Sequence, residues 1–471
     1  MENGEGGSFT GGSSGAEAQE PESQVELLTI RCIFSVVSTL GENSPKWEGK
    51  ALEALTLLES CDRPLFITGK AGTGKSTLLR HFTAKNRDKN MAVLAPTGVA
   101  ALNARGQTIH SFFRFPHHPF HPSQIKKVSK AKRKLYENLE MIIIDEISMV
   151  RADMMDNIDA FLRKNGPSSG KPFGGVRMVF FGDLFQLPPV IAHEIEEQLM
   201  SLLYDSPYFF SAYVLQKTGL KTLNLEKIYR QKDPVFMDLL NAVRHKELRP
   251  GQLEMLNSRY IPDFRIPEDA FYITLTATNR RAATINERHL AALPDTALSY
   301  TAKRSGTFPD RLSPNEEELK LKVGAQVMFI RNDPQRRWVN GSIGKVTGLD
   351  DDSVLVELVD NGLEYEVEKV EWEMLKYRFD DKKHTIDTDV IGTFSQLPIR
   401  PAWAITIHKS QGKTFERVII DTGSGAFASG QIYVALSRCT SLEGIVLRQR
   451  IRAEEIKIDE EVLDFAAGQG I

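Results

Sequence analysis

One eight-residue stretch constrains the fold of this chain more than any other. Residues 69–76, GKAGTGKS, match the Walker A pattern G-x-x-x-x-G-K-[ST] at every fixed position. The apolar residues 64–68 before it suit a buried strand, and residues 77–82 after it suit the first turns of a helix. The glycines let backbone N–H groups surround a polyphosphate, and the helix N-terminus adds a partial positive charge. The stretch therefore predicts a nucleotide-binding loop.

The residues of this loop have separate expected roles. Lys75 supplies a positive charge to the β- and γ-phosphates of ATP, and Ser76 offers its hydroxyl to Mg²⁺. A glycine-rich turn without a ligand is the alternative, and a second motif downstream argues against it. The residues expected around the nucleotide are Gly69, Ala71, Gly72, Thr73, Gly74, Lys75, Ser76 and Thr77.

The second motif is a buried strand that ends in two carboxylates. Residues 141–144 are all apolar, and Asp145 and Glu146 follow directly. We expect Asp145 to hold Mg²⁺ together with Ser76 and water, and Glu146 to orient or deprotonate the attacking water. An apolar run followed by Asp-Glu is a weak signal alone. It becomes a strong one in a domain that also carries a complete Walker A motif.

Composition bounds the remaining possibilities. The chain has 471 residues, enough for about two to four domains, and its net charge of −3 creates no global basic field, so a nucleic-acid site must be a local groove. Cys32, Cys61 and Cys439 are far apart and match no zinc spacing, which indicates reduced thiols. No apolar run reaches membrane-spanning length, and the absence of Lys or Arg before Arg31 argues against a secretory signal or transit peptide.

The segment 64–215 alternates strands and helices as a doubly wound α/β domain does. The strand 91–95 leads to Thr97, which opens a helix at a position suited to a phosphate. The strand 176–181 leads to Gln186, whose amide can sense the γ-phosphate or the water beside it. Ligands of such domains bind at the carboxyl ends of the parallel strands, where these residues fall.

Two features of this segment leave alternatives open. His117, His118 and His121 invite a zinc site, but the intervening prolines and the lack of a fourth ligand favour a surface loop. Residues 126–134 hold six basic residues among nine, which fits a solvated helix face or a contact with a nucleic-acid backbone.

A second α/β set follows and is interrupted by β-rich sequence. The strand 271–276 leads to Thr278 and Asn279, which open a helix with another N-terminus suited to phosphate. Residues 319–370 alternate as strands do and contain turn signals, which predicts a small inserted β-barrel. The α/β character returns from Pro401, with strands at 418–421 and 445–447 and a helix at 431–438.

Together these motifs resemble the Pif-type DNA helicases of superfamily one, over roughly residues 51–447. The resemblance implies an α/β fold with two RecA-like P-loop domains, ATP between them, and a small SH3-like β-barrel inserted in the second domain. Residues 171–175, 321–328 and 339–344 are similar to further stretches of that family. The main blocks are GKAGTGKST from Gly69, APTGVAA from Ala95, IIDEIS from Ile143, GDLFQLPPV from Gly182, AITIHKSQG from Ala404 and YVALSR from Tyr433.

The resemblance also implies site residues. Arg230 and Arg438 come from the second domain to the γ-phosphate, where a planar, always charged guanidinium can stabilise the transferring phosphoryl group. Gln411 and Gly412 belong to the same interface. The family usually carries a glutamine upstream of the P-loop that recognises adenine, and Glu48 stands nearest to that position, which puts selectivity for ATP in doubt. The residues implied to face DNA are Thr97, Gly98, His110, Thr278, Asn279, His408 and Lys409.

The predicted domain boundaries follow from these blocks. Residues 1–24 are a disordered tail and 25–46 an N-terminal extension. The first RecA-like domain spans 47–215, with a small insertion near 114–136. The second spans 216–318 and 396–471, includes a C-terminal helix, and surrounds the SH3-like insertion at 319–395.

The resulting hypothesis is an ATP- and Mg²⁺-dependent DNA helicase that moves 5′ to 3′ on single-stranded DNA. We expect a monomer without membrane contact that acts on forks or duplexes with a 5′ tail, with G-quadruplex or R-loop DNA as further substrates. Roles in DNA repair, recombination and telomere maintenance fit that family. The compartment would be the bacterial cytoplasm with its nucleoid, or the nucleus of a eukaryote. The alternatives are an RNA-directed helicase and a P-loop nucleotide switch without nucleic-acid activity.

Overall fold

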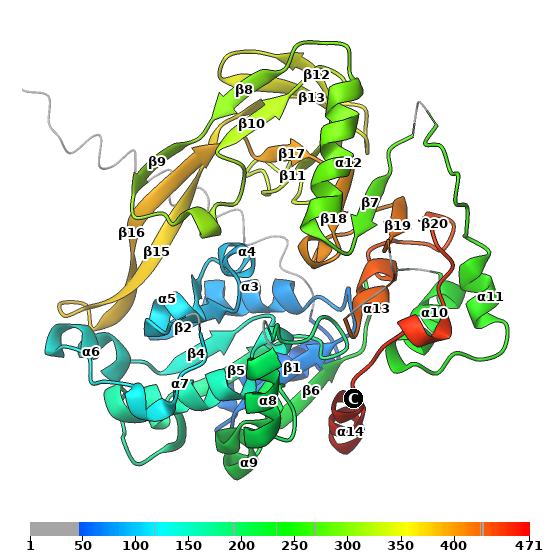
Figure 1. Ribbon diagram of the computed structural model, residues 1–471. Helices are drawn as coiled ribbons and strands as arrows, with labels where there is room; N and C mark the ends of the chain where they lie inside the picture. The colour runs from blue at the N-terminus through cyan, green and yellow to red at the C-terminus, as the bar shows by residue number, and fades with distance from the viewer. Residues whose placement is uncertain are drawn as a thin grey trace, which may run out of the picture. The chain divides into compact units, whose positions relative to one another are not determined.

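Six parallel strands form the first sheet, in the order β3-β2-β4-β5-β1-β6 (Figure 1). The computed structural model describes residues 47–116, 118–191, 194–231, 233–267, 270–423, 425 and 428–471. Strands β1 and β4 are buried along their whole length, as apolar parallel strands covered by helices are. The strands are β1 (Leu65–Gly69), β2 (Met91–Ala95), β3 (Gln107–Thr108), β4 (Met141–Ile144), β5 (Arg177–Phe181) and β6 (Lys221–Leu225).

Helices connect these strands, and several pack directly on the sheet. Helix α2 packs against β1 and β6, and α3 starts at the P-loop and packs against β1. The helices are α2 (Lys50–Ser60), α3 (Lys75–Lys85), α4 (Gly98–Asn103), α5 (Ile109–Phe113), α6 (Lys130–Glu137), α7 (Ala152–Asn165), α8 (Glu194–Leu203) and α9 (Tyr213–Thr218), with 3₁₀ turns η1 (Pro122–Gln124), η2 (Ile147–Met149), η3 (Pro172–Gly175) and η4 (Phe209–Ser211).

Four parallel strands form a second sheet, in the order β18-β7-β19-β20. Its strands come from both sides of the β-rich insertion: β7 precedes it and the other three follow it. The elements are β7 (Ile273–Thr276), β18 (Ala404–Thr406), β19 (Val418–Asp421), β20 (Ile445–Leu447), α10 (Pro234–His245), α11 (Gln252–Asn257), α12 (Asn279–Ala292), α13 (Gln431–Leu436) and α14 (Glu460–Gln469), with turns η6 (His408–Ser410) and η7 (Ala453–Glu455).

The first domain extends beyond the predicted boundary at residue 215. Strand β6 pairs with β1 along its whole length, so residues 221–225 belong to the first sheet. Helix α14, expected with the second domain, packs on the first: the Phe465 ring stacks on Phe210 with 4.2 Å between centroids, and Thr222 Oγ1 donates to Gln469 Oε1 at 2.8 Å. The sequence identifies these elements, but the surface that each covers is set by tertiary packing.

The β-rich insertion is wider than the predicted range 319–395. Its strands run from Leu298 to Pro401, because β8 and β9 pair with later strands of the insertion. They form sheets of order β14-β13-β12-β11-β17, β15-β16-β9 and β10-β8, and the SH3-like form of this region stays a prediction. The elements are β8 (Leu298–Thr301), β9 (Lys303–Gly306), η5 (Asp310–Leu312), β10 (Glu318–Leu321), β11 (Gln326–Phe329), β12 (Ile343–Leu349), β13 (Ser353–Leu358), β14 (Glu364–Glu368), β15 (Val370–Asp380), β16 (Thr385–Gln396) and β17 (Ile399–Pro401).

The long β15–β16 hairpin contacts the first domain near α6 (Figure 1). The Val93 N–H donates to Tyr377 Oη at 2.9 Å, and the Ile386 N–H donates to Asn90 Oδ1 at 2.8 Å. Lys134, from the basic run, forms an ion pair with Asp381 at 2.6 Å. Part of the basic run thus has a partner within the protein, and its contact with nucleic acid stays a prediction.

The structure also describes part of the histidine loop and two of the cysteines, and it bears on the expectations about metal sites and membrane spans. His121 caps η1, with its Nδ1 accepting from the Ser123 N–H at 3.2 Å. No group of three His, Cys, Asp or Glu among the described residues could hold a metal ion, although His117 lies outside them. Within the same residues no helix has the length and apolar character to cross a membrane. Cys61 and Cys439 are free thiols, and the predicted tail (1–24), extension (25–46) and Cys32 lie outside the described residues.

Candidate ATP site between the two domains

The P-loop turns between β1 and α3 with glycines at the positions that need them. Gly72 and Gly74 both have φ of +85°, a left-handed conformation that favours glycine. A Cβ on Gly72 would lie 2.6 Å from Arg230 Cβ, so no side chain fits there. The residue before Arg230 is tied to the same glycine, because the Tyr229 N–H donates to the Gly72 carbonyl at 2.9 Å.

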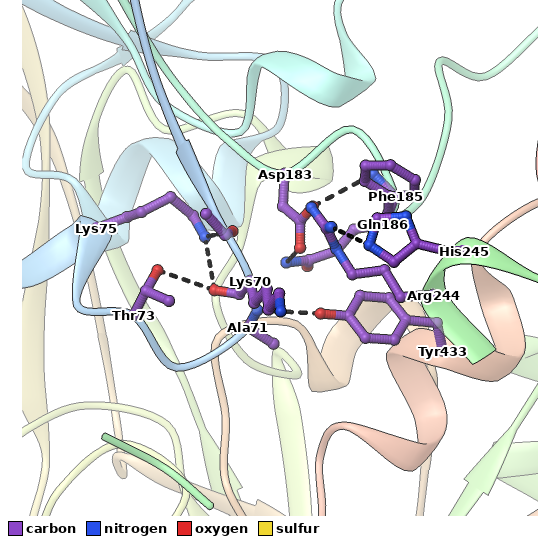
Figure 2. Close-up of polar contacts among 11 residues, drawn as sticks. Lys70, Ala71, Thr73, Lys75, Asp183, Phe185, Gln186, Arg244, His245 and Tyr433 are labelled. Atoms are coloured by element: carbon purple, nitrogen blue, oxygen red, sulfur yellow. Dashed lines mark hydrogen bonds and ion pairs between the residues drawn. The ribbon is translucent and has the colours of Figure 1, made fainter. Parts of the chain in front are cut away.

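Lys75 folds back over its own loop (Figure 2). Its Nζ donates to the carbonyl oxygens of Gly69 and Lys70, at 2.5 and 3.1 Å. Thr73 Oγ1 donates to the same Lys70 carbonyl at 2.9 Å. Burial lowers the pKa of Lys75, and the carboxylates of Asp183 and Glu146 act in the opposite direction. The ammonium therefore lies, partly buried, within the loop that would surround the phosphates.

Asp145 and Glu146 follow β4 into the same pocket. The Glu146 N–H donates to Asp145 Oδ1 at 3.0 Å, and Glu146 has a left-handed φ of +52°. Burial raises the pKa of both carboxyls, and the neighbouring Asp145 helps to raise that of Glu146 to about 7. Lys75 and Arg438 lower the pKa of Glu146 and so lie within its electrostatic range. The structure thus brings together three predicted elements of the site.

Asp183 is a buried site residue for which the sequence predicted no role (Figure 2). Arg244 Nη2 donates to its Oδ1 at 3.0 Å, and Gln186 Nε2 donates to its Oδ2 at 3.1 Å. Burial alone would raise the pKa of Asp183, but Arg244, Lys75 and the Gln186 bond together lower it. The amide of Gln186, predicted to sense the γ-phosphate, is therefore engaged by Asp183 in this conformation.

Arg244 comes from α10 of the second domain, and its charge was not predicted as part of the site. Its guanidinium carbon lies 3.7 Å from the centre of the Phe185 ring, a cation–π contact, and its side chain is 3% exposed. An arginine at the end of an amphipathic helix gives no sequence signal of such burial.

Tyr433 of α13 connects the second domain to the P-loop directly. The Ala71 N–H donates to Tyr433 Oη at 3.1 Å, and burial raises the pKa of this phenol to about 12 (Figure 2). The tyrosine opens the YVALSR block, which was the available signal, although the contact itself spans two domains.

Of the two predicted arginines, Arg438 lies in the second domain as expected, and Arg230 does not. Arg230 lies on the connection that follows β6, next to the P-loop, rather than within the second domain. Its Nη1 donates to the Ser437 carbonyl at 3.2 Å, so the side chain crosses to the second domain. Arg438 is 1% exposed and donates through Nε to the Val434 carbonyl at 2.9 Å and through Nη2 to Ser437 Oγ at 2.8 Å. Burial lowers the pKa of Arg438 to about 9.

Gln411 and Gly412 lie near Arg438. Arg438 Nη1 donates to the carbonyls of Ser410 and Lys413, at 3.3 and 3.4 Å, on either side of the pair. Gln411 Nε2 is buried without a hydrogen-bond partner among the described residues, and Gly412 has a φ of +75°. A buried donor without a partner is costly, which is consistent with a ligand at this position.

The predicted DNA contacts are distributed over both domains. Thr97 caps α4 by accepting from the Ala100 N–H at 3.2 Å, and Thr278 caps α12 by accepting from the Arg281 N–H at 3.3 Å. Thr97 and His110 line one cavity of about 210 Å³. A Cβ on Gly98 would lie 2.6 Å from Leu312 Cδ2, so the insertion covers this glycine.

The remaining predicted contacts lie in the second domain. His408 and Lys409 form η6, and burial lowers the pKa of both. Asn279 is exposed on the first turn of α12. Glu48, the expected adenine-side residue, is exposed.

Two parallel sheets with a Walker A loop, a carboxylate pair and arginines between them define a P-loop ATPase with two RecA-like domains. A family model described as PIF1-like helicase matches residues 50–250, and one described as DNA helicase Pif1, 2B domain, matches residues 312–349. The ATP-dependent DNA helicase Pif1 of Bdellovibrio bacteriovorus is 35% identical over 420 residues, which cover 88% of this chain and 90% of that protein. The chain belongs to the PIF1-like helicase family, and is thus an ATP-hydrolysing helicase.

Longer relatives and solved structures agree with this assignment. The mouse ATP-dependent DNA helicase PIF1 is 33% identical, and the match covers 86% of this chain but 60% of the mouse protein. The crystal structure of Bacteroides sp Pif1 in complex with ADP-AlF4 has a TM-score of 0.83 at 37% identity and covers 91% of this chain and 98% of that one. Bacteroides Pif1 bound to ssDNA has a TM-score of 0.64 at 38% identity, covering 90% and 97%. The domain arrangement described here is thus more similar to the former.

Proposed function

We propose that this chain hydrolyses ATP between its RecA-like domains and uses their movement to travel 5′ to 3′ on single-stranded DNA and open duplexes. The observation that carries the proposal is the contact of the second domain with the P-loop, made by Tyr433 Oη at Ala71 N. A nucleotide in the loop would lie beside this contact, so its binding and release would change the relative position of the two domains.

The donors at the loop fit a magnesium ion. The Ser76 hydroxyl and the Asp145 carboxylate would hold it, and both are oxygen ligands of the kind that Mg²⁺ prefers. Two protein ligands suffice, because Mg²⁺ keeps several waters and binds phosphate oxygens. When bound, the ion neutralises charge on the β- and γ-phosphates.

Residues of the chain itself have separate roles in the hydrolysis of ATP. Glu146 orients the water and accepts its proton, a role that suits a carboxyl with a pKa of about 7. Lys75 leaves the loop carbonyls and binds the phosphates. Arg230 and Arg438 now donate to carbonyls of the second domain, and we infer that they exchange these bonds for the γ-phosphate when the domains close.

DNA would lie across both domains. Thr97 and Thr278 stand at helix N-termini, which attract phosphate, and His408 and Lys409 add donors on the second domain. One similar structure is Bacteroides Pif1 bound to ssDNA, and another concerns DNA unwinding at forked dsDNA by two coordinating Pif1 helicases, which supports strands and forks as substrates. The direction 5′ to 3′ rests on the family.

The proposal also covers particular DNA structures, the oligomeric state and the cellular compartment. We extend it to G-quadruplex and R-loop DNA and to a monomer as the working form. The compartment is the one that holds the DNA: the nucleus of a eukaryotic cell, or the cytoplasm with its nucleoid in a bacterium.

DNA-stimulated ATPase activity tests the proposal against a nucleotide switch. ATP turnover with Mg²⁺ is expected to rise when single-stranded DNA is added, and Lys75→Ala is expected to abolish it because the phosphates lose their buried positive charge. Lys85→Ala, at the exposed end of the same helix, is the matched control and should keep the activity. Turnover that DNA does not change would contradict the proposal.

A further inference from the structure

A cavity of about 990 Å³ opens on the second domain, away from the P-loop residues described above. Helix α12 forms one wall, and the ends of β7 and β19 and the loop at residues 264–266 complete it. Figure 1 shows α12 beside β7 in the second domain. Thr278, at the N-terminus of α12, is the one predicted DNA contact that lines it.

The lining of this cavity, here called the α12 cleft, is strongly basic. Among its described residues Asp421 is the single carboxylate, against five arginines and His289. The arginines are Arg265, Arg280, Arg281, Arg288 and Arg448. This density is unusual in a chain whose net charge is −3, and like charges so close together repel unless an anion lies among them.

The arginines fall into two groups by their partners. Arg281 Nη2 pairs with Asp421 Oδ2 at 2.7 Å, and Arg448 Nη1 donates to the Pro262 carbonyl at 2.6 Å, so these two shape the cleft wall. Arg265, Arg280 and Arg288 are exposed and have no ion-pair partner among the described residues. Within the part of the chain that the structure describes, three exposed guanidinium groups are therefore available to a ligand.

The spacing on α12 suits a polymer more than a small anion. Arg280, Thr284 and Arg288 are each four positions apart and all line the cleft, so they follow one another along one side of the helix. Phe264 also lines the cleft, with its ring edge-to-face against Tyr272 at 5.0 Å between centroids, and adds an aromatic surface on which a base can stack. Positive groups that follow a backbone, with an aromatic ring beside them, are the usual elements of a single-strand site.

We propose that the α12 cleft binds a segment of single-stranded DNA that continues past Thr278, beyond the strand held at the helix N-terminus. Arg265, Arg280 and Arg288 contact phosphates of this segment, and Phe264 contacts a base. This inference rests on the proposed function, since it requires a DNA strand at Thr278. It adds a binding site that would hold the strand while the contacts of the two domains alternate.

The test compares a core oligothymidine of about 8 nucleotides with versions extended by about 6 nucleotides at either end, using fluorescence anisotropy. For the wild type, extension at one end should tighten binding. The variant R280A/R288A should lose that gain and bind the core as the wild type does. For the extended strand, the slope of log affinity against log salt should fall by about 1.4, the value for two phosphate contacts on a single strand.

Two further variants keep the result interpretable. R265E changes the loop instead of the helix and should also reduce the gain in affinity that the extended strand gives. It therefore tests the cleft independently if thermal unfolding shows that R280A/R288A is poorly folded. K85A/R87A removes two exposed positive charges from the first domain and should leave the gain intact.

The proposal is overturned if R280A/R288A keeps the gain from extension, or if it loses as much affinity for the core. A loss for an acidic peptide but not for DNA would also overturn it, because the cleft would then be a protein-binding site. Stimulation of wild-type ATPase by the core oligonucleotide separates the two hypotheses. If the core oligonucleotide stimulates ATPase activity and R280A/R288A still binds the extended strand more tightly than the core, the proposed DNA site in the α12 cleft is wrong. The proposed helicase function is then retained.

Discussion

Arg244 Nη2 lies 3.0 Å from Asp183 Oδ1, and this ion pair joins α10 of the second domain to the buried end of β5 in the first. The same carboxylate accepts from Gln186, so the residue predicted to sense the γ-phosphate is linked to the second domain through two bonds. Both charged side chains are almost completely buried, so neither can rely on water. The pair is therefore a connection between nucleotide site and domain arrangement.

Removing one partner of this pair should be costly. Arg244→Ala leaves Asp183 buried without its main counter-charge, and we expect a loss of about 3–5 kcal/mol in the free energy of unfolding at neutral pH. Because Asp183 has a lowered pKa in the folded protein, the pair stabilises above the ordinary pKa of aspartate and loses that effect as the pH falls through the lowered value. Urea unfolding at several pH values measures both the loss of stability in Arg244→Ala and its dependence on pH.

An exposed ion pair provides the control for Arg244. Arg249 and Asp238 pair at the surface with side chains 65% and 55% exposed, and Arg249→Ala should cost about 0–1 kcal/mol. The double variant D183N/R244M should recover much of the loss, since both charges are gone. Equal costs for Arg244→Ala and Arg249→Ala would show that the buried pair contributes little.

Glu146 gives a pH-dependent prediction in the protein without nucleotide. Burial and Asp145 raise its pKa from 4.5 to about 7, so between these values the folded state retains a proton that the unfolded chain releases. The stability of the wild type should therefore fall as the pH rises through this window, by about 3 kcal/mol. Glu146→Gln lacks the group, so its melting temperature should exceed that of the wild type at pH 8 and approach it at pH 5.

The exposed Glu140, just before β4, is the matched control for this measurement. Glu140→Gln should follow the wild type at every pH. A difference in melting temperature between Glu146→Gln and the wild type that stays constant from pH 5 to pH 8 would contradict the raised pKa of Glu146. With ATP and Mg²⁺, Glu146→Gln should bind nucleotide and lose turnover, because Asp145 is retained.

Arg438 should affect turnover far more than nucleotide binding. Its guanidinium is placed beside the site by bonds to Val434 and Ser437, and loss of an arginine that stabilises the transferring phosphoryl group lowers kcat by roughly 10³-fold or more. Arg438→Lys keeps the charge but loses the planar fork, so it should also be impaired. Steady-state kinetics and a nucleotide-binding titration check this.

Arg450, exposed on the same domain and 5.0 Å from the Tyr260 ring, serves as the control and should tolerate alanine. A change confined to KM in the Arg438 variants would mean that this arginine only contributes to binding of ATP.

Local patterns predicted the strands and the turn that carry the two motifs, because each depends on a few consecutive residues. The loop at Gly69–Ser76 and the pair Asp145–Glu146 lie at strand ends, and strand ends are visible in apolar runs. Strand alternation and turn signals predicted the insertion, and the family resemblance added its expected SH3-like form and the two arginines. These parts of the fold and site needed no knowledge of how the sheets pack together.

Contacts between distant segments could not be predicted in the same way. Tyr433 and Ala71 are 362 positions apart, and Asp183 and Arg244 belong to different domains, so their bonds depend on domain packing. The edge position of β6 and the packing of α14 on Phe210 depend on which surfaces remain free once the sheets form. The position of Arg230 on the connection after β6 follows from the same pairing.

The central claim is movement 5′ to 3′ along one strand, driven by ATP at the domain boundary. The most direct measurement compares ATP-dependent unwinding of two duplexes of equal length and sequence, one with a single-stranded 5′ tail and one with a 3′ tail, with Lys75→Ala as the inactive control. We predict unwinding of the 5′-tailed duplex and little or none of the 3′-tailed duplex. Equal unwinding of both, or preference for the 3′ tail, would contradict it.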